Sequence, residues 1–307
     1  MTEARIAGKV MLSGEYAVLY DAPAVLLPVP RHLTVYESKH RPLKPLSRVA
    51  HAASVYPVPA LRLAERELPP LHCVVDQGEF ITSDKHGRAM KLGIGTSAAE
   101  AVGVLALRYL RTGMDWREHQ AQLLTDAIQI HVQAQANIGS GADVAACVYG
   151  KPIKFCRSGK TPVATPLAEE TSPAVPLALV WTGQPADTRK LVRQFCEYVQ
   201  HNQAQMQPLL KKLESLAAAL GDAWFDATPE TLYGLVDEYC AEMRASAAAA
   251  NLPWELKAHQ ELAAWARKHD GRAKPTGAGG GDMVLLIGDL PLQKLEQHGA
   301  LVIRLLV

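Results

Sequence analysis

The chain has 307 residues, 48% of them hydrophobic, and its 32 Lys and Arg residues nearly balance 31 Asp and Glu residues. This composition predicts packed cores with room for two domains, and the net charge of +1 argues against a nucleic-acid partner. Five cysteines without a CxxC spacing argue against a disulfide framework and a cysteine zinc site, so we expect a cytoplasmic protein. We expect it to be neither exported nor membrane-embedded, because it has no signal-peptide core and no apolar run near the ~20 residues that span a bilayer.

The first 76 residues read as a small sheet followed by an irregular excursion. Short β-rich runs between residues 5 and 37 are broken by Gly and Pro, which predicts strands joined by tight turns; the runs are Val10 to Leu12, Ala17 to Tyr20, Ala24 to Val29 and Leu33 to Tyr36. Residues 40 to 70 have weak periodicity, with one short helix expected around Ala60 to Arg66. Leu71 to Asp76 is a strand candidate.

The stretch from Lys91 to Arg108 has the pattern of a phosphate cradle. Gly93 and Gly95 allow the backbone to bend and approach a ligand, and Thr96 and Ser97 add hydroxyls where a helix to about Arg111 begins. Ser97 and Glu100 have the spacing of a capping box. The first helical turn would direct unpaired N–H groups at an anion. A glycine turn that simply enters a buried helix is the competing interpretation.

The middle of the chain predicts a second helix and then a boundary. Helical spacing extends from Trp116 to Gln135 and stops at the glycine-rich loop before Asp143. Pro152 to Arg157 predicts a strand, and the proline-rich segment Ser158 to Pro176 is the best linker candidate. Beyond it we expect separated strands and helices, an α+β arrangement. The strands are Leu177 to Trp181, Met283 to Ile287 and Leu301 to Leu306, and the helices are Arg189 to Ala219, Pro229 to Ala249, Trp254 to His269 and Pro291 to His298.

Four clusters of glycine and polar residues could carry chemistry. They are Gly8 to Tyr16 with Lys9, Gly93 to Ser97, Gly139 to Asp143, and Lys274 to Asp282. Taken singly, Lys9 could be an edge-strand lysine that reaches water, and Asp143 could be a helix cap. The last cluster has four glycines in five positions, which favours close backbone approach to a ligand.

Other phosphate and hydrolase motifs fail on inspection. Gly159-Lys160-Thr161 is not a Walker A motif, because Lys154 stands where the leading glycine should be. Gly93-x-Gly95-x-x-Ala98 satisfies the dinucleotide fingerprint, but no buried parallel strand precedes it. There is no HExxH, GxSxG or paired-cysteine pattern.

Taken in this order, the clusters resemble the three motifs of the GHMP kinases, the family of galactokinase, homoserine kinase, mevalonate kinase and phosphomevalonate kinase. Gly8 to Leu19 is similar to motif one, Gly93 to Ala99 to motif two, and Lys274 to Asp282 to motif three. Further similarity to the phosphomevalonate kinase branch lies in Tyr16, in His131 with Gln135, in Gly139 to Ala146, and in Trp181-Thr182-Gly183 with Thr188. The sequence departs from the family pattern at three points. It reads Gly-Ile-Gly-Thr-Ser where the family usually has Gly-Leu-Gly-Ser-Ser, and the chain is short for a phosphomevalonate kinase. It also lacks a glutamate between Ile130 and Gln135, the region where mevalonate kinases typically bind magnesium.

The resemblance implies an α+β, two-domain fold with an N-terminal β-α sandwich (residues 1–165), a C-terminal ferredoxin-like α/β layer (166–307) and the active site in the interdomain cleft. It implies phosphoryl transfer from ATP with Mg²⁺ to a small phosphorylated or hydroxy-acid substrate, foremost 5-phosphomevalonate, with no nucleic acid and no membrane. Mevalonate kinase or another alcohol kinase of the family is the alternative, and a nucleotide-binding module without catalysis is a different class. A homodimer is compatible with this interpretation.

The resemblance also assigns roles to individual residues. Lys9 and Asp143 would be catalytic, and the hydroxyl of Ser97 would reach the metal. The nucleotide-binding residues would be Lys91, Gly93, Ile94, Gly95, Thr96, Ser97 and Ala98. The substrate-binding residues would be Ser13, Glu15, Tyr16, Ser140, Gly141, Thr182, Arg189, Lys274, Thr276, Gly277, Ala278 and Gly279.

Overall fold

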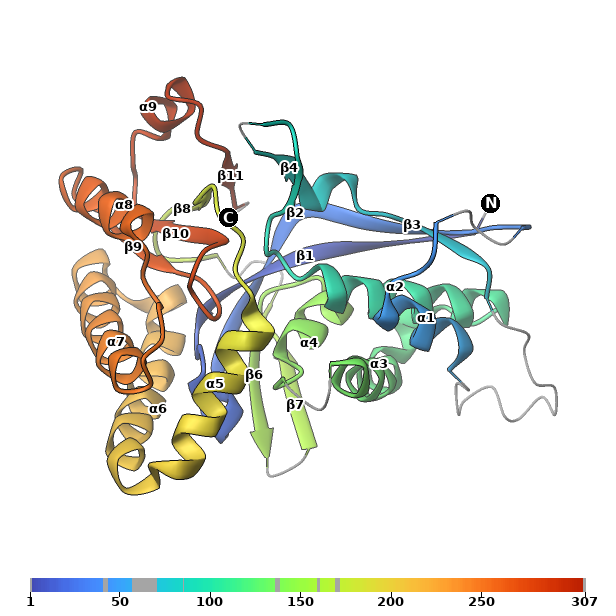
Figure 1. Ribbon diagram of the computed structural model, residues 1–307, viewed down its shortest axis with the longest axis horizontal. Coiled ribbons are helices and arrows are strands. Elements are labelled where there is room, and N and C mark those ends of the chain that lie inside the picture. Colours follow the sequence, from blue (N-terminus) through green and yellow to red (C-terminus); the bar gives the residue numbers. More distant parts are fainter. Residues whose placement is uncertain are drawn as a thin grey trace.

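The computed structural model describes residues 2–40, 44–56, 71–84, 86–135, 139–158, 161–168 and 172–305. Two antiparallel sheets, each with its own helices, lie at the two ends of an elongated molecule (Figure 1). In the part of the chain that the structure describes, no helix is both long and apolar enough to cross a membrane.

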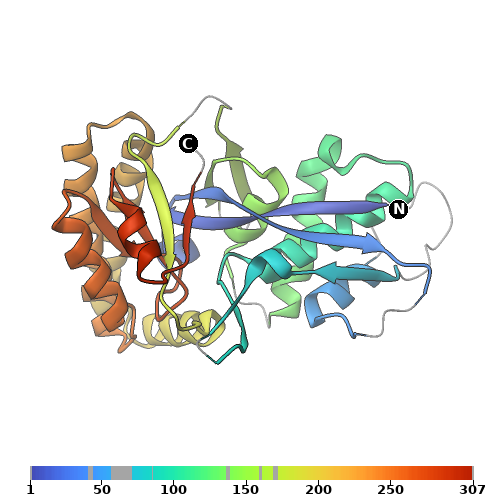
Figure 2. The same cartoon turned by 90° about the horizontal axis from the view of Figure 1, so that it is seen from above.

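The N-terminal sheet is organised around two long strands. β1 (Glu3–Ser13) and β2 (Ala24–Glu37) pair antiparallel, and the register shifts between Ala7 and Gly8, opposite the Pro30 region of β2. Figure 2 shows these strands running side by side from the N-terminus to the C-terminal helices. The strand order is β1-β2-β6-β7, with β3 on β2; the short strands are β3 (Cys73–Asp76), β6 (Ile153–Ser158) and β7 (Thr161–Pro166).

Two expectations for this half are wrong. The run Ala17–Tyr20 forms a 3-10 helix, η1, because Tyr16 and Asp21 on either side have positive φ angles and turn the chain. The linker candidate contains β7, which pairs with β6 across the start of the supposed linker. The expected helix from residue 60 to 66 lies outside the described residues. The described part of the excursion contains α1 (Arg48–Val55), capped by Ser47.

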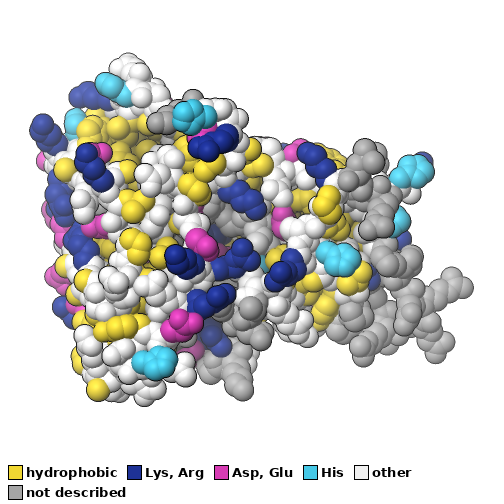
Figure 3. All heavy atoms as spheres, viewed as in Figure 1, with side chains coloured by type: hydrophobic (Ala, Val, Ile, Leu, Met, Phe, Trp, Pro, Cys, Tyr) yellow, Lys and Arg dark blue, Asp and Glu magenta, His cyan; other side chains and the backbone are white. Residues whose placement is uncertain are grey.

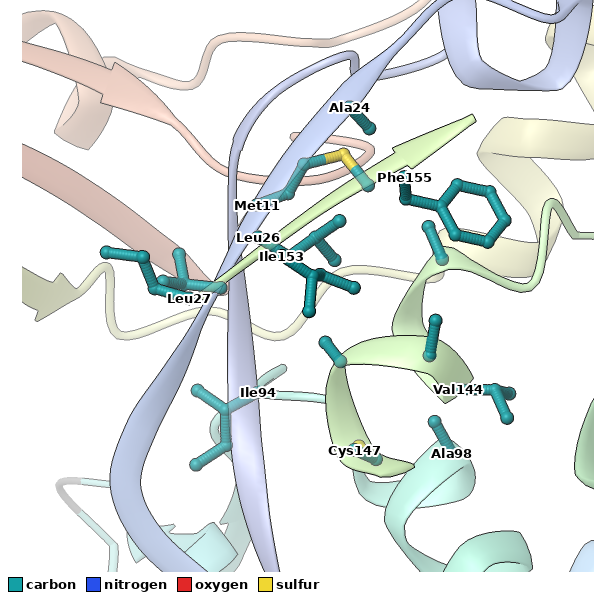
Figure 4. Packing of buried hydrophobic residues seen from close by; sticks show 14 of the residues in the cluster. Met11, Ala24, Leu26, Leu27, Ile94, Ala98, Val144, Cys147, Ile153 and Phe155 are labelled. Atoms are coloured by element: carbon teal, nitrogen blue, oxygen red, sulfur yellow. The ribbon is translucent and has the colours of Figure 1, made fainter. Parts of the chain in front are cut away.

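Helices cover one face of the N-terminal sheet. α2 (Thr96–Arg111) and α4 (Ala142–Tyr149) pack directly on β1 and β2, while α1 and α3 (Gln120–Ala134) pack on α2. Figure 4 shows side chains of the strands, Met11, Leu26 and Phe155 among them, facing Val144 and Ala98 of the helices. The 3-10 helix η4 (Trp116–His119) leads into α3, the 3-10 helix η3 (Gly78–Phe80) follows β3, and a hairpin of β4 (Ile81–Ser83) and β5 (Ala89–Lys91) leads towards α2.

The C-terminal sheet has the strand order β11-β8-β10-β9 and is buried on both faces. Alternation along β8 directs Ala178 and Val180 towards α8 and α9, and Leu177 and Leu179 into the main core with α6 and α7. The strands are β8 (Leu177–Trp181), β9 (Arg272–Pro275), β10 (Met283–Ile287) and β11 (Val302–Arg304). The helices are α5 (Thr188–His201), α6 (Gln203–Asp226), α7 (Pro229–Ala249), α8 (Lys257–Arg267) and α9 (Leu292–Gln297).

Both halves share one hydrophobic core. α6 packs against the far ends of β1 and β2, where Gly221 leaves room for Val25. The expectation of a single helix from residue 189 to 219 is wrong. The helix is interrupted at Asn202, and the second of the two resulting helices continues to Asp226. β9 lacks a sequence signal of its own. The proposed boundary at residues 165 and 166 stays a prediction.

Candidate active site

A cleft of about 730 Å³ opens between the two halves. Its walls come from β1, the start of α2 and the start of α4 on one side, and from the start of α5 and the loop before β10 on the other. α5 lies between the halves in Figure 1, and lysine and arginine side chains gather near the middle of the face seen in Figure 3. Most residues assigned from the motifs line this cleft: Lys9, Glu15, Tyr16, Lys91, Gly93, Gly95, Thr96, Ser97, Ser140, Gly141, Asp143, Arg189, Thr276, Gly277 and Ala278.

Lys9 and Asp143 meet in the cleft, 134 positions apart in the chain. The Lys9 ammonium lies 3.2 Å from Asp143 Oδ1, and the Lys9 side chain is only 9% exposed. The simpler interpretations therefore fail for both residues. Lys9 does not reach into bulk water, and the N-cap of α4 is Gly141 rather than Asp143, which stands in the first turn. The pair leaves a cation and a carboxylate facing the same space.

The glycine stretch before α2 curls against Lys9. The backbone N–H of Lys9 donates to the Ile94 carbonyl at 2.9 Å, and Gly93 and Gly95 have φ angles of +76° and +91°. A Cβ on Gly95 would lie 2.9 Å from Lys9 Cε, and a Cβ on Gly93 would collide with the Asp282 carboxyl group. Both glycines are therefore required by conformation and by space.

The expected capping box is absent at the start of α2. Gly95 is the N-cap and makes no side-chain cap bond, and Ser97 lies two residues beyond it, too far into the helix to act as the cap. Glu100 instead accepts hydrogen bonds from Ser47 and Gln77, and burial raises the pKa of its carboxyl group. Glu100 thereby ties the cap of α1 to α2.

The Ser97 hydroxyl contacts the end of α3. Its oxygen lies 2.9 Å from His131 Nε2 and 2.9 Å from the Gln135 amide nitrogen. Burial lowers the pKa of His131, although nearby Asp143 acts in the opposite direction, so the ring is predominantly neutral at pH 7. Ser97 therefore sits in a neutral hydrogen-bonding cluster at the wall of the cleft.

Three helix N-termini open onto this space. Thr96 of α2, Gly141 before α4 and Thr188 of α5 all line the cleft. Helix N-termini attract anions because their first N–H groups lack intrahelical partners and the helix dipole is positive there. Four cationic side chains line the same cleft: Lys9, Arg48, Lys91 and Arg189. The cleft is thus suited to an anionic ligand.

The loop before β10 closes the cleft from the C-terminal half. Tyr16 OH donates to the Ala278 carbonyl at 2.8 Å, which fixes this loop to the turn after β1. Gly277 has a φ of +63° with open space around it, whereas a Cβ on Gly279 would collide with Trp254. Only part of this glycine-rich loop therefore faces the cleft, and the rest packs against protein.

Glu15 and Lys274 form a buried ion pair. Lys274 Nζ donates to Glu15 Oε1, Tyr239 OH donates to Glu15 Oε2 at 2.8 Å, and both side chains of the ion pair are 0% exposed. The ion pair joins the turn after β1 to β9. Lys274 does not line the cleft, because its ammonium group is buried against Glu15, and its assignment to substrate binding stays a prediction.

Five further assigned residues do not line the cleft. Ile94 and Ala98 are core residues, and Ser13 is fully buried on β1. Thr182 donates to the Gln184 carbonyl at 3.0 Å, and Gly279 packs on Trp254. The resemblance assigned all five to the site, but in the structure they pack within the protein or bond locally and do not line the cavity.

Asp282 lines the cleft, although the resemblance assigns it no role. Its Oδ1 accepts from the Ala186 N–H at 3.0 Å, and its carboxyl group lies against Gly93. Burial raises the pKa of Asp282, while the Ala186 bond and Lys9 oppose that rise. Its φ of 56° is unusual for aspartate and belongs to the same turn as the glycines before it. That unusual backbone was not readable from the sequence.

The lining residues fit a nucleotide with its magnesium ion. The glycine cradle and helix N-termini suit phosphates, and Mg²⁺ is commonly held by one or two protein oxygens together with substrate phosphates. Ser97, Asp143 and Asp282 supply oxygen atoms in the cleft. Among the described residues no group of three or more His, Cys, Asp or Glu residues could hold a metal by itself, which suits an ion carried by phosphates.

Comparison with solved structures agrees with this architecture, whereas no family model and no curated protein matches the sequence. A Listeria innocua protein of known structure aligns with a TM-score of 0.79 at 24% identity, covering 98% of this chain and 96% of that one. Streptococcus pneumoniae phosphomevalonate kinase, in complex with phosphomevalonate and AMPPNP, aligns at 0.78 with 16% identity over 99% and 100% of the two chains. L. major mevalonate kinase, in complex with R-mevalonate, aligns at 0.67 with 19% identity over 96% and 89%. The chain therefore has the GHMP kinase fold that its three motifs predict.

Proposed function

We propose that this protein transfers the γ-phosphoryl group of ATP to a small acceptor, foremost 5-phosphomevalonate, which would yield diphosphomevalonate and ADP. The observation that carries the proposal is the Lys9–Asp143 pair, held 3.2 Å apart beside a glycine cradle and three helix N-termini. Phosphoryl transfer needs positioning and positive charge more than covalent chemistry, and this cleft offers both.

Different residues of the cleft have different roles in the proposed reaction. The glycine cradle from Gly93 to Gly95 and the first N–H groups of α2 bind the nucleotide phosphates. ATP with Mg²⁺ supplies the activated phosphoryl group. Lys9 lines the cleft beside Asp143, where its ammonium group offsets the negative charge that develops as the phosphoryl group moves. Buried surroundings strengthen that interaction, because only 9% of the Lys9 side chain is exposed.

The role of Asp143 depends on the acceptor. An alcohol must lose a proton as it attacks, so an alcohol kinase needs Asp143 as a base. A phosphate monoester, with a second pKa of about 6, is already mostly ionised at pH 7. With 5-phosphomevalonate, Asp143 would chiefly orient Lys9 through their ion pair.

The acceptor side carries a cation suited to a charged substrate. Arg189 lies in the first turn of α5 and lines the cleft, close in sequence to the cap formed by Asp187. Lys274 is buried and paired with Glu15, which leaves Arg189 as the better-placed cation for this purpose. We infer that Arg189 and the α5 N-terminus bind an anionic group of the acceptor. The Streptococcus pneumoniae structure with bound phosphomevalonate supports this choice of acceptor.

A coupled assay of ADP release tests the proposal. The purified chain is given ATP, Mg²⁺ and either 5-phosphomevalonate, mevalonate, homoserine or galactose, and we expect turnover with 5-phosphomevalonate. Turnover of mevalonate alone would replace it with the mevalonate kinase alternative, and no turnover with any acceptor would favour a non-catalytic nucleotide-binding module.

A variant of Asp143 distinguishes a phosphate acceptor from an alcohol acceptor. We expect Asp143→Asn to lower kcat by about tenfold with a phosphate acceptor, less than the 10²–10⁴ that general-base removal typically costs. A loss of about 10³ or more would indicate that the acceptor is an alcohol.

A further inference from the structure

The end of α3 places two polar side chains on the Ser97 hydroxyl, and the proposed reaction gives neither of them a role. His131 and Gln135 stand four residues apart, so they share one face of the helix end. His131 Nε2 and the Gln135 amide nitrogen each lie 2.9 Å from Ser97 Oγ, and 2.6 Å from one another. All three side chains line the cleft.

The donors and acceptors in this cluster fix the direction of each hydrogen bond. The Gln135 amide nitrogen can only donate, and it faces both His131 Nε2 and Ser97 Oγ. Nε2 is therefore an acceptor, and the Ser97 hydroxyl donates its single proton to it. Because a hydroxyl has two lone pairs and Gln135 uses one, Ser97 retains one lone pair and no proton for the cleft.

The burial of His131 supports a role beyond packing. The ring is 7% exposed, and its Nδ1 is buried with no hydrogen-bond partner among the described residues. With Nε2 accepting, Nδ1 carries the proton, and an unsatisfied buried N–H costs about 1–3 kcal/mol. The fold thus leaves one ring nitrogen unsatisfied while the other is engaged with Ser97, an arrangement more typical of functional sites than of packing.

We propose that His131 and Gln135 are positioning residues that turn the remaining lone pair of Ser97 towards a divalent cation carried by the nucleotide phosphates. The inference rests on the proposed function, since it needs a metal–nucleotide complex in this cleft. Without the two partners, the hydroxyl would rotate freely and could present its proton to the cation. Residues that orient a metal ligand in this way typically change metal affinity by about 10- to 100-fold when replaced.

The test measures binding rather than turnover. AMPPNP affinity of the full chain is determined by calorimetry with Mn²⁺ and again with EDTA, and the ratio of the two affinities gives the contribution of the metal. We expect both His131→Leu and Ser97→Ala to lower this ratio about tenfold, while the affinity in EDTA stays within about twofold of wild type. The exposed Gln133, on the same helical turn, provides the control Gln133→Leu, which should keep the wild-type ratio.

Two further variants separate positioning from structural damage. The double variant Ser97→Ala with His131→Leu should lose no more than either single variant, because His131 acts only through Ser97. His131→Gln restores an acceptor oxygen and should recover part of the ratio. Additive losses, or a wild-type ratio in His131→Leu, would overturn the inference, as would a wild-type chain that binds AMPPNP equally well with and without Mn²⁺. A wild-type chain that binds no AMPPNP at all would overturn the proposed function as well.

Discussion

The proposed nucleotide side and the proposed acceptor side of the cleft are formed by different kinds of structure. The nucleotide side consists of backbone: Gly93, Gly95 and the start of α2 come from one continuous stretch. The acceptor side consists of side chains and loops from opposite ends of the chain, where Tyr16 holds Ala278 and Glu15 holds Lys274. A backbone cradle depends on local conformation, whereas the acceptor side depends on long-range packing. The two sides should therefore respond differently to substitution.

In the proposed reaction Lys9 acts on the phosphoryl group that passes from one side to the other, so its loss should have the largest effect. Lys9→Ala removes the ammonium group that offsets the transferred charge, and we expect kcat to fall by about 10³-fold with AMPPNP affinity changed only a few-fold. The ADP-release assay and calorimetry measure the two quantities. A kcat within a few-fold of wild type would show that Lys9 has no part in the transition state.

Breaking the buried Glu15–Lys274 pair should destabilise the protein rather than weaken a contact with the substrate. Lys274→Met leaves the Glu15 carboxylate buried and unpaired, which we expect to cost about 3–5 kcal/mol in the free energy of unfolding. Urea denaturation measures it. Lys154→Met is the matched control, because its pair with Asp222 is exposed and should contribute no more than about 1 kcal/mol. Unchanged stability with a raised KM for the acceptor would restore Lys274 as a substrate ligand.

The nucleotide side can be tested with a pair of glycines. Gly93→Ala imposes a positive φ on alanine and drives its Cβ into Asp282, whereas Gly113→Ala at φ +79° meets nothing within 4 Å. Both variants should lose about 1–2 kcal/mol of stability from the left-handed backbone. Only Gly93→Ala should also weaken AMPPNP binding, by about tenfold or more, as calorimetry would detect. Equal nucleotide affinities in the two variants would contradict the cradle.

The smallest expected effect concerns His259, next to the loop before β10, here called the acceptor loop. His259 Nδ1 accepts the Leu256 N–H at 2.9 Å, and burial lowers the pKa of His259 despite opposing influences from Glu255 and the Gly281 backbone. The unfolded chain, with a pKa of about 6.5, therefore binds the proton more readily, so stability falls as the pH decreases below about 7.

His259→Asn removes this proton-binding group and should make the decrease in Tm between pH 7.5 and 5.5 smaller by about 2 °C, measured by scanning calorimetry. Exposed His298→Asn is the control and should keep the wild-type decrease. A His259→Asn protein with the full wild-type decrease would show that His259 does not govern it.

The sequence predicted elements well where local signals and packing agree. Pro229–Ala249 and Met283–Ile287 have the predicted bounds, because Thr228 and Pro229 start α7 with a cap and an N1 proline, and β10 is a short apolar run bounded by turns. Prediction failed where a tertiary contact decided the outcome. Glu100 accepts hydrogen bonds from Ser47 and Gln77 of other segments instead of forming a capping box. The helix break at Asn202 has a local cause, because the Asn202 side-chain amide donates to the Tyr198 carbonyl at the end of α5.

The same distinction holds for the candidate site. Lys9, Gly93 and Asp143 line one cleft, as expected from their local and recognisable motifs, while their roles stay predictions. The sequence could not indicate that Lys274 would turn away from the cleft towards Glu15, or that Asp282 would lie against Gly93. Those outcomes depend on contacts between segments separated by most of the chain.

The bonds that fix the acceptor loop also have a consequence for biosynthesis. Glu15 and Lys274 are 259 residues apart, and Tyr16 and Ala278 are 262 apart. N-terminal segments generally fold first as a chain emerges from the ribosome, so the cradle can form early while Glu15 and Tyr16 still lack their partners. The cleft is completed only when β9 and β10 have been synthesised. Translation that stops before residue 274 would therefore release a chain with a phosphate cradle and no closed acceptor side, unable to position a second substrate beside Lys9.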